Sequence, residues 1–347
     1  MKGTDRAKAS CTAPRLKHAG LMTITADDLV FARDADGVFI TRQMATRAVS
    51  RGTAIRIAPG VYAPASRWAA VPSLDQHRLL VYAVVSTRRV DVVVSHWSAA
   101  ALHGLPRLGR WPDRVHVTQD ASSTSRSRGI VIRHNRRLLP EDIVVIDGIA
   151  TTSIARTILD IAAISDFRAG VVVADGALYR HRIDRPVAWT TTEQLSDAWE
   201  RAHPFRGEVR ASEVMAFGVT GAQTPLESVS RVTMREIGCP PPTLQHAYFD
   251  DDGFIGESDF SWLDLGGIAE ADGKNKYLDA AMRSGRSVEQ VLFDEKVRED
   301  RLRTASRFFG RWGWETAIDP RRLHARLSRM GLPLPPLRRV TVPQRLD

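Results

Sequence analysis

Acidic residues in the second half of the chain have the types and spacing that metal-dependent phosphodiester chemistry requires. Asp259 and Glu270 lie in two short alternating segments, 255–262 and 265–270, with a Leu-Asp-Leu-Gly-Gly turn between them. A hairpin of this kind brings both carboxylates to one end of a sheet. Because residues two apart on a strand share a face, Asp272 is expected to point the same way as Glu270.

Oxygen ligands of this kind suit Mg²⁺ or Mn²⁺, with Asp259 and Glu270 as the expected metal ligands. A bound metal would activate water and stabilise the charge that develops on a phosphate. Lys274 and Lys276 follow closely and would supply a positive charge for the phosphate or the attacking water. The alternative interpretation is that these acids are solvated strand ends.

The surrounding sequence resembles the restriction-like endonuclease domains related to the very-short-patch repair endonucleases, within the PD-(D/E)xK superfamily. The matching words, in order, are PLESVSR (225–231), GCPPPTLQ (238–245), ESDFSW (257–262), EADGKNKY (270–277) and EKVREDRLRTASRFFGRWGWE (295–315). The resemblance implies an αβββαβ domain with a long amphipathic helix over 288–309 and a last strand near 312–318.

By the same resemblance, Glu227, Asp259 and Glu270 match the acidic positions of the superfamily. The sequence departs from the pattern at Asp272, which stands where the superfamily has lysine. Lys274 or Lys276 would then have to take over that role. A nuclease fold retained only for binding DNA is the alternative.

The N-terminal part has the pattern of a winged helix-turn-helix. Helices are predicted over 24–33 and 41–51, followed by a hairpin over 54–64 with a Pro-Gly turn. A recognition helix and wing of this kind contact double-stranded DNA in the major groove and along the backbone. The side chains predicted to make these contacts are Arg42, Gln43, Thr46, Arg47, Arg51 and Arg56. The alternative is an amphipathic helix with a solvated basic face.

Three further words, RIAPGVYAP (56–64), VSHWSAAALHGLP (94–106) and GIATTSIARTILDIA (148–162), resemble the AbiEi family. These are the antitoxins of bacterial type IV toxin–antitoxin systems, and the likeness covers residues 24–180. It implies that the winged helix binds operator DNA and represses its own toxin–antitoxin or phage-defence operon. It also implies that the cognate toxin is countered only indirectly, without a stable complex, and that Arg42, Arg47 and Arg56 contact DNA.

The expected fold class is therefore mixed α+β: a winged helix-turn-helix, a mixed α/β middle domain and a restriction-endonuclease-like domain. The predicted segments are a basic lead (1–22), the winged helix (23–68), the middle domain (69–222), the nuclease-like domain (223–319) and a Pro/Arg-rich, solvated tail (320–347) that can hold one helix over 320–330. Residues 1–165 carry 23 lysines and arginines against 13 acids, whereas residues 166–347 carry 26 against 27. The basic half is the one expected to meet a polyanion.

Other features limit the classes of function. Cys11 and Cys239 have no metal-binding or disulfide spacing, and no apolar run reaches the length of a membrane span, so a cytoplasmic protein without a membrane partner is expected. His96 and His103 are predicted to be structural, with backbone partners. Arg156 and Asp160 are four apart on a predicted helix and are expected to pair.

Two classes of function remain. The first is a DNA-binding regulator of antitoxin type in which the nuclease-like part is a second DNA-engaging or degenerate module. The second is an active Mg²⁺-dependent endonuclease that its winged helix targets to DNA. A third interpretation, interaction with proteins only, would require the basic half to be incidental. A homodimer would suit a palindromic operator, although no coiled-coil heptads are present.

Overall fold

A computed structural model of the chain describes residues 29–31, 42–87, 92–119, 127–179, 187–272 and 287–337. The fold is mixed α+β, as predicted, and the chain forms two compact units. Unit 1 comprises residues 1–165 and 190–212, and unit 2 comprises residues 166–189 and 213–347. The chain therefore leaves unit 1, contributes a segment to unit 2, returns, and leaves again.

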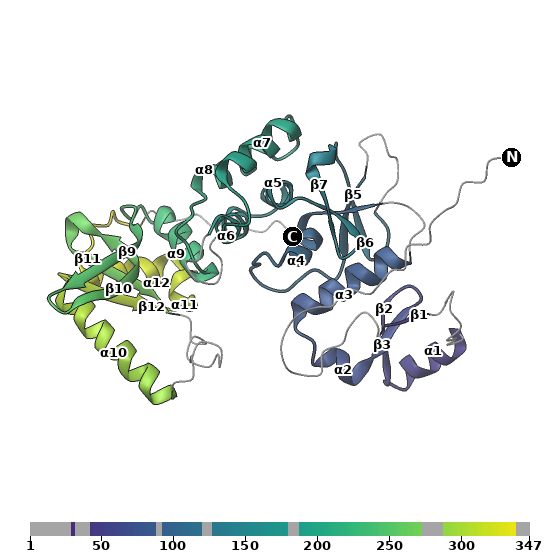
Figure 1. Cartoon of the computed structure of the whole chain (residues 1–347), viewed down its shortest axis with the longest axis horizontal. Coiled ribbons are helices and arrows are strands. Elements are labelled where there is room, and N and C mark those ends of the chain that lie inside the picture. The colour runs from purple at the N-terminus through teal and green to yellow at the C-terminus, as the bar shows by residue number, and fades with distance from the viewer. Residues whose placement is uncertain are drawn as a thin grey trace. The chain divides into compact units, whose positions relative to one another are not determined.

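Unit 1 contains a three-stranded and a five-stranded sheet with their helices (Figure 1). Its strands are β1 (Val30–Phe31), β2 (Ala54–Ala58), β3 (Val61–Pro64), β4 (Val93–Val94), β5 (Val115–Gln119), β6 (Val131–Asn135), β7 (Ile143–Ile146) and β8 (Ile149–Thr152). Its helices are α1 (Arg42–Ser50), α2 (Ala65–Ala69), α3 (Ser73–Ser86), α4 (His96–His103), α5 (Ile154–Ile164) and α7 (Thr192–Ala202), with a 3-10 turn at Pro140–Asp142.

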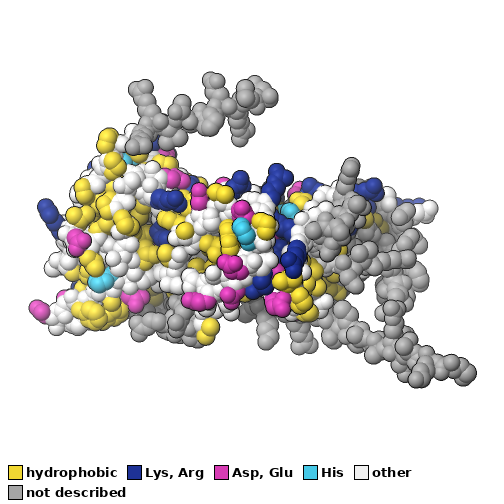
Figure 2. All heavy atoms as spheres, turned by 90° about the horizontal axis from the view of Figure 1, so that it is seen from above, with side chains coloured by type: hydrophobic (Ala, Val, Ile, Leu, Met, Phe, Trp, Pro, Cys, Tyr) yellow, Lys and Arg dark blue, Asp and Glu magenta, His cyan; other side chains and the backbone are white. Residues whose placement is uncertain are grey.

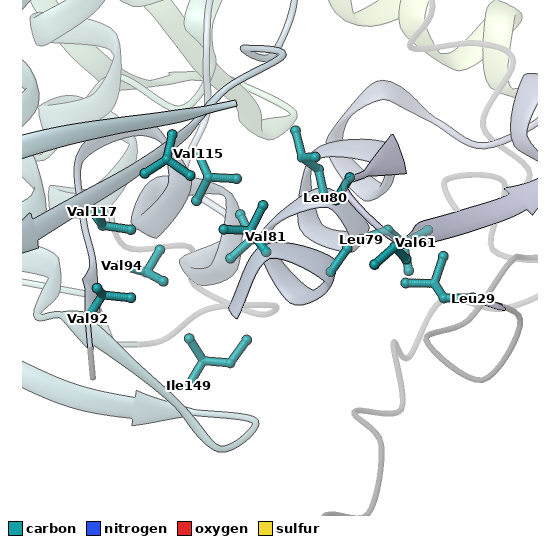
Figure 3. Packing of buried hydrophobic residues seen from close by; sticks show 14 of the residues in the cluster. Leu29, Val61, Leu79, Leu80, Val81, Val92, Val94, Val115, Val117 and Ile149 are labelled. Carbon is teal, nitrogen blue, oxygen red and sulfur yellow. The ribbon is translucent and has the colours of Figure 1, made fainter. Parts of the chain in front are cut away.

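Helix α3 joins the two sheets of unit 1 through one apolar core. In Figure 3, Leu79 of α3 lies beside Val61 of the small sheet, and Val81 lies toward Val94 and Val117 of the larger one. All these side chains are buried. The apolar contacts on both sides of α3 hold the hairpin region onto the rest of unit 1.

The larger sheet has the order β6-β5-β4-β8-β7, with β5 parallel to β6 and β4 parallel to β8. Val115 and Val117 point toward α3 (Figure 3), and Val131, which pairs with Val115, belongs to the same apolar core. Side chains alternate along a strand, so His116 and His134 are on the opposite face of this sheet. Two polar rings are thus placed together on the face away from α3.

Unit 2 is built on a four-stranded sheet of order β12-β11-β10-β9, in which β12 runs parallel to β11 and the other pairs are antiparallel (Figure 1). Its strands are β9 (Thr243–Asp250), β10 (Gly253–Trp262), β11 (Gly267–Ala271) and β12 (Phe308–Trp312). Its helices are α6 (Phe167–Leu178), α9 (Pro225–Glu236), α10 (Val288–Thr304), α11 (Trp314–Ala317) and α12 (Pro320–Met330), with a 3-10 turn at Leu263–Leu265. Helix α8 (Glu208–Phe217) spans the last crossing between the units.

Local capping signals define where several helices begin. The N-cap side chains of Ser153, Asp166, Thr224, Ser287 and Asp319 each accept a hydrogen bond from a backbone N–H in the first turn of α5, α6, α9, α10 and α12. Proline occupies the first helical position in α9 and α12, where its missing N–H costs nothing. The start of the helix that carries Glu227 is thus determined locally.

The structure corrects three predicted elements. Residues 30 and 31 lie in β1, a strand paired with β3, and not in a helix over 24–33. The long helix ends at Thr304 rather than at residue 309, because the following aromatic residues form β12 beside β11. The predicted strand near 312–318 is wrong, since β12 ends at Trp312 and α11 begins at Trp314.

The tail is also more ordered than predicted over its first part. Leu323 and Leu327 of α12 are fully buried, so α12 packs as an element of unit 2 and is not a solvated end. None of the helices within the described ranges has both the length and the apolar character needed to cross a membrane.

Candidate functional site

Glu227 is held at the beginning of α9 by its own helix. Thr224 Oγ1 donates to Glu227 Oε1 at 2.8 Å, and the Gln223 N–H donates to Glu227 Oε2 at 2.8 Å. Together with the Glu227 N–H that donates to Thr224 Oγ1, these contacts cap the first turn of α9. The buried carboxylate therefore has a structural role that is independent of any chemistry.

A row of four polar side chains crosses the sheet of unit 2, one from each strand. Gln245 on β9, Asp259 on β10 and Glu270 on β11 occupy adjacent positions in the register, and Glu270 pairs directly with Arg311 on β12. The Ala271 N–H donates to Asp259 Oδ2 at 2.7 Å, so a side chain replaces a main-chain partner at this point. The predicted convergence of Asp259 and Glu270 is present in the structure.

Gln245 connects this row to Glu227. Its Nε2 donates to Glu227 Oε2 at 3.1 Å and lies 3.5 Å from Asp259 Oδ1. Its φ is +50°, in the left-handed region that residues other than glycine rarely adopt. Backbone strain of this kind persists where the surroundings hold a side chain in one place.

Two guanidinium groups bind the carboxylate of Glu270. Arg298 of α10 donates to Oε1 at 2.7 Å, and Arg311 Nη2 lies 3.2 Å from Oε2. Arg311 also contacts Glu295 and Glu299 of α10. Burial raises the pKa of Glu270, and the two arginines oppose that shift because they favour the ionised carboxylate.

The residues of this row do not fit a Mg²⁺ or Mn²⁺ centre as they stand. Asp259 and Glu270 offer oxygen atoms of the right chemistry, but Arg298 and Arg311 already neutralise Glu270 from two sides. Asp272 lies beyond the end of β11, with Oδ2 3.9 Å from Arg311 Nε. Lys274 and Lys276 lie outside the described residues.

An arginine-lined pocket of about 620 Å³ lies next to this row and shares Arg311 with it. Arg321, Arg322, Arg326 and Arg329 of α12 also line the pocket. The buried Nε of Arg326 has no hydrogen-bond partner within the described part of the chain. Guanidinium groups that converge in this way match the geometry of phosphate oxygens.

The predicted DNA-contact residues lie together on α1 and the hairpin that follows it. Gln43, Thr46, Arg47, Arg51 and Arg56 are exposed, and the structure does not describe the side chain of Arg42. Residues 37–74 contain five arginines and no aspartate or glutamate. Among the described residues, Arg47, Arg51 and Arg56 have no acidic partner, so their charges are available to an anion.

On the face that Figure 2 draws, dark blue and magenta side chains are interspersed among hydrophobic ones. No continuous field of one sign covers the described atoms on that face.

Sequence reasoning missed Gln245, Arg298 and Arg311. Arg311 carried a usable signal, because it is a lone charged residue in the aromatic strand Phe308–Trp312. Gln245 and Arg298 had no such signal. Their roles depend on the register of β9 and on how α10 lies against the sheet.

The prediction that His96 and His103 both have backbone partners is confirmed for His103 and wrong for His96. His103 Nε2 contacts the Thr152 carbonyl at 2.7 Å, as expected of a structural histidine with a backbone partner. His96 instead contacts the hydroxyl of Ser95, and its buried Nε2 has no partner within the described residues. The predicted ion pair is confirmed, since Arg156 Nε lies 3.2 Å from Asp160 Oδ1.

A scan against protein-family models finds no match to this chain, and a search of curated proteins finds no relative.

Proposed function

We propose that this chain is a DNA-binding regulator of the AbiEi antitoxin type that represses its own operon and counters its toxin only indirectly. The observation that carries the proposal is that Arg47, Arg51 and Arg56 are exposed and have no acidic partner among the described residues, in a stretch of sequence without acids. A helix followed by a hairpin can place these side chains against a major groove and the flanking phosphates. Counterion release from those phosphates supplies the affinity.

Unit 2 serves in this proposal as a second surface that engages DNA without cutting it. The pocket lined by the α12 arginines supports phosphate binding. The order of helices and strands in the sheet beside it is compatible with the αβββαβ order that the resemblance implies. The pairing of Glu270 with Arg298 and Arg311 argues against a metal at that row. The second candidate function, Mg²⁺-dependent cleavage, therefore becomes an outcome of the test.

The test titrates the full chain against a labelled duplex from upstream of its own coding sequence and against a scrambled duplex, over a range of salt concentrations. Arg47→Ala should weaken binding of the upstream duplex by about 1 kcal/mol or more and reduce the slope of log affinity against log salt by about one. Arg303→Ala is the matched control, because Arg303 lies on α10 and already pairs with Glu299. Equal effects of the two variants on DNA binding would show that α1 is not part of the DNA-binding surface.

The same samples are incubated with Mg²⁺, with Mn²⁺ and with chelator, and the DNA is examined for cuts. We expect a mobility shift without cleavage in all three. Metal-dependent cleavage that Asp259→Asn abolishes would overturn the inference about unit 2 and establish an endonuclease. A failure of Arg47→Ala to affect binding would instead count against the role of α1, so the two conclusions are tested separately.

A further inference from the structure

Three histidine rings of unit 1 lie together on elements other than α1 and the β2–β3 hairpin. His96 begins α4, His116 lies on β5, and His134 lies on β6. One ring nitrogen from each residue lies within 4.8 Å of the others. Among the described His, Cys, Asp and Glu side chains, this is the group whose ligand atoms converge in a way that would suit a metal ion.

The secondary structure forces this convergence. The parallel pairing of β5 and β6 places Thr118 opposite His134, so His116 and His134 are diagonal neighbours on one face. The Ser95 N–H donates to the His116 carbonyl at 3.0 Å, which fixes the start of α4 beside β5. His96 then has a φ of +50°, an unfavourable conformation that directs its ring over His134 with 3.6 Å between ring centroids.

Hydrogen bonds within the group leave some atoms without partners. His116 Nδ1 and His134 Nε2 are 3.0 Å apart and share one hydrogen bond. His96 Nε2 and Asp160 Oδ2 are buried and have no hydrogen-bond partner in the described residues. Leaving a buried polar atom unsatisfied is unfavourable, so the group is incomplete as a purely internal network.

We propose that His96, His116 and His134 form a binding site for a divalent transition-metal ion of the Zn²⁺ class. Imidazole nitrogen is a preferred ligand of such ions, whereas Mg²⁺ and Ca²⁺ prefer oxygen. In a tetrahedral site with Zn–N bonds of about 2.0 to 2.1 Å, ligand nitrogens are roughly 3.4 Å apart. The ligand nitrogens now lie within 4.8 Å of one another and the rings of His96 and His134 are stacked, so the rings must both approach and turn to reach that geometry.

The electrostatic surroundings are consistent with this site. Burial lowers the pKa of all three histidines, to about 3 for His116 and about 4 for His134, so each imidazole is neutral near pH 7 and keeps a lone pair for a metal. Arg136 and Arg156 lie nearby, and their charges are offset by the carboxylate of Asp160 together with that of Asp142, which pairs with Arg156. Asp160 Oδ2 lies 4.0 Å from His96 Nδ1 and places negative charge at the edge of the site.

The ion would cross-link three elements that are distant in the sequence. It would hold α4, β5 and β6 together on the face of the sheet opposite α3. Because His96 is fully buried and His116 nearly so, the ion would be largely shielded from solvent. Its presence would therefore be expected to raise the stability of unit 1.

The experiment strips the full-length protein of metal with a chelator and titrates it with Zn²⁺ against a competing chromophoric chelator, with Co²⁺ as a visible reporter. We expect one equivalent of Zn²⁺ per chain. His116→Gln and His134→Gln should each weaken binding by at least about 100-fold, more than removing an outer-shell partner usually does. His203→Gln is the matched control, because His203 is half-exposed and pairs with Glu208.

Absence of stoichiometric Zn²⁺ binding by the wild-type protein would overturn the proposal, and so would unchanged binding in folded His116→Gln and His134→Gln. Circular dichroism establishes whether the variants are folded. If they are not, X-ray absorption at the zinc edge of the wild-type complex decides the question. A first shell that contains about three imidazole nitrogens supports the site, whereas a shell of oxygen alone shows that zinc is bound elsewhere.

Discussion

At the scale of single residues, His77 shows how burial turns a titratable side chain into a pH-dependent stability term. Its Nδ1 lies 2.6 Å from the Pro112 carbonyl and must donate, so its Nε2, 2.9 Å from Ser98 Oγ, accepts. Burial lowers the pKa of His77 from 6.5 to about 4, against the opposing hydrogen bond to Pro112. Between pH 6.5 and about 4, the His77 ring is therefore neutral in the folded protein and protonated in the unfolded chain.

The consequence is a loss of stability on acidification. Between pH 6.5 and about 4 the unfolded state binds the proton that folded His77 does not, so the free energy of unfolding falls as pH falls. The loss is at most about 1.4 kcal/mol per pH unit for this residue. Urea denaturation at several pH values should show a shallower dependence for His77→Gln than for the wild type. Parallel curves would mean that another group dominates acid unfolding.

The sequence predicted the two acids Asp259 and Glu270 but not the arginines that contact Glu270. Asp259 and Glu270 could be found because alternation along a hairpin depends only on nearby residues. Their arginine partners could not, because Arg298 and Arg311 reach Glu270 through the packing of α10 and the parallel pairing of β12. The same distinction applies to the histidine group, whose members come from α4, β5 and β6.

At the scale of elements, the structure enlarges the predicted pair on α5 into a network between segments. Arg156, fully buried, contacts Asp142 Oδ2 at 2.9 Å and Asp160 Oδ1 at 3.2 Å. Arg201 of α7 reaches Asp142 from the outside, at 3.1 Å. The i,i+4 spacing predicted one bond of this network, whereas the bonds to Asp142 join α5 and α7 to the turn before β7 and have no local signal.

This network predicts a large effect for one substitution. Arg156→Met leaves Asp142 and Asp160 with less compensation in the interior, and should lower the free energy of unfolding by about 3 to 5 kcal/mol. Arg201→Ala is the control, because its side chain is a quarter exposed and Arg156 still serves Asp142 after its loss. Urea denaturation of the two variants compares them directly. A larger loss for Arg201→Ala would mean that α7, and not the buried arginine, holds this region.

At the scale of the whole molecule, the segments predicted from the sequence are contiguous, but the two compact units are not. The predicted middle and C-terminal segments meet between residues 222 and 223, whereas the chain crosses between units after residues 165, 189 and 212. Sequence patterns cannot show that a helix is exchanged between units, because its apolar face looks the same whichever core receives it. Helix α6 is such a case: it precedes α7 in the sequence but belongs to the core of unit 2.

The contacts of α6 give the reason why it cannot be omitted. Asp175 of α6 lies 2.6 Å from Arg231 of α9 and accepts the Val219 N–H at 2.9 Å. Arg231 is buried, and Val171 and Val172 of α6 are also buried. Removing α6 would expose apolar surface on α9 and leave a guanidinium without its carboxylate.

We therefore expect a chain of residues 213–347 to lose cooperative unfolding, whereas a chain of residues 166–347, which retains α6, unfolds cooperatively. Circular dichroism in urea measures both transitions under the same conditions. A third chain, 166–347 with Asp175→Asn, separates the charge from the apolar contacts and should have a lower urea midpoint than 166–347 but remain folded. Cooperative unfolding of 213–347 at the midpoint of 166–347 would show that α6 is dispensable. It would then place the start of unit 2 close to the boundary predicted from the sequence, between residues 222 and 223.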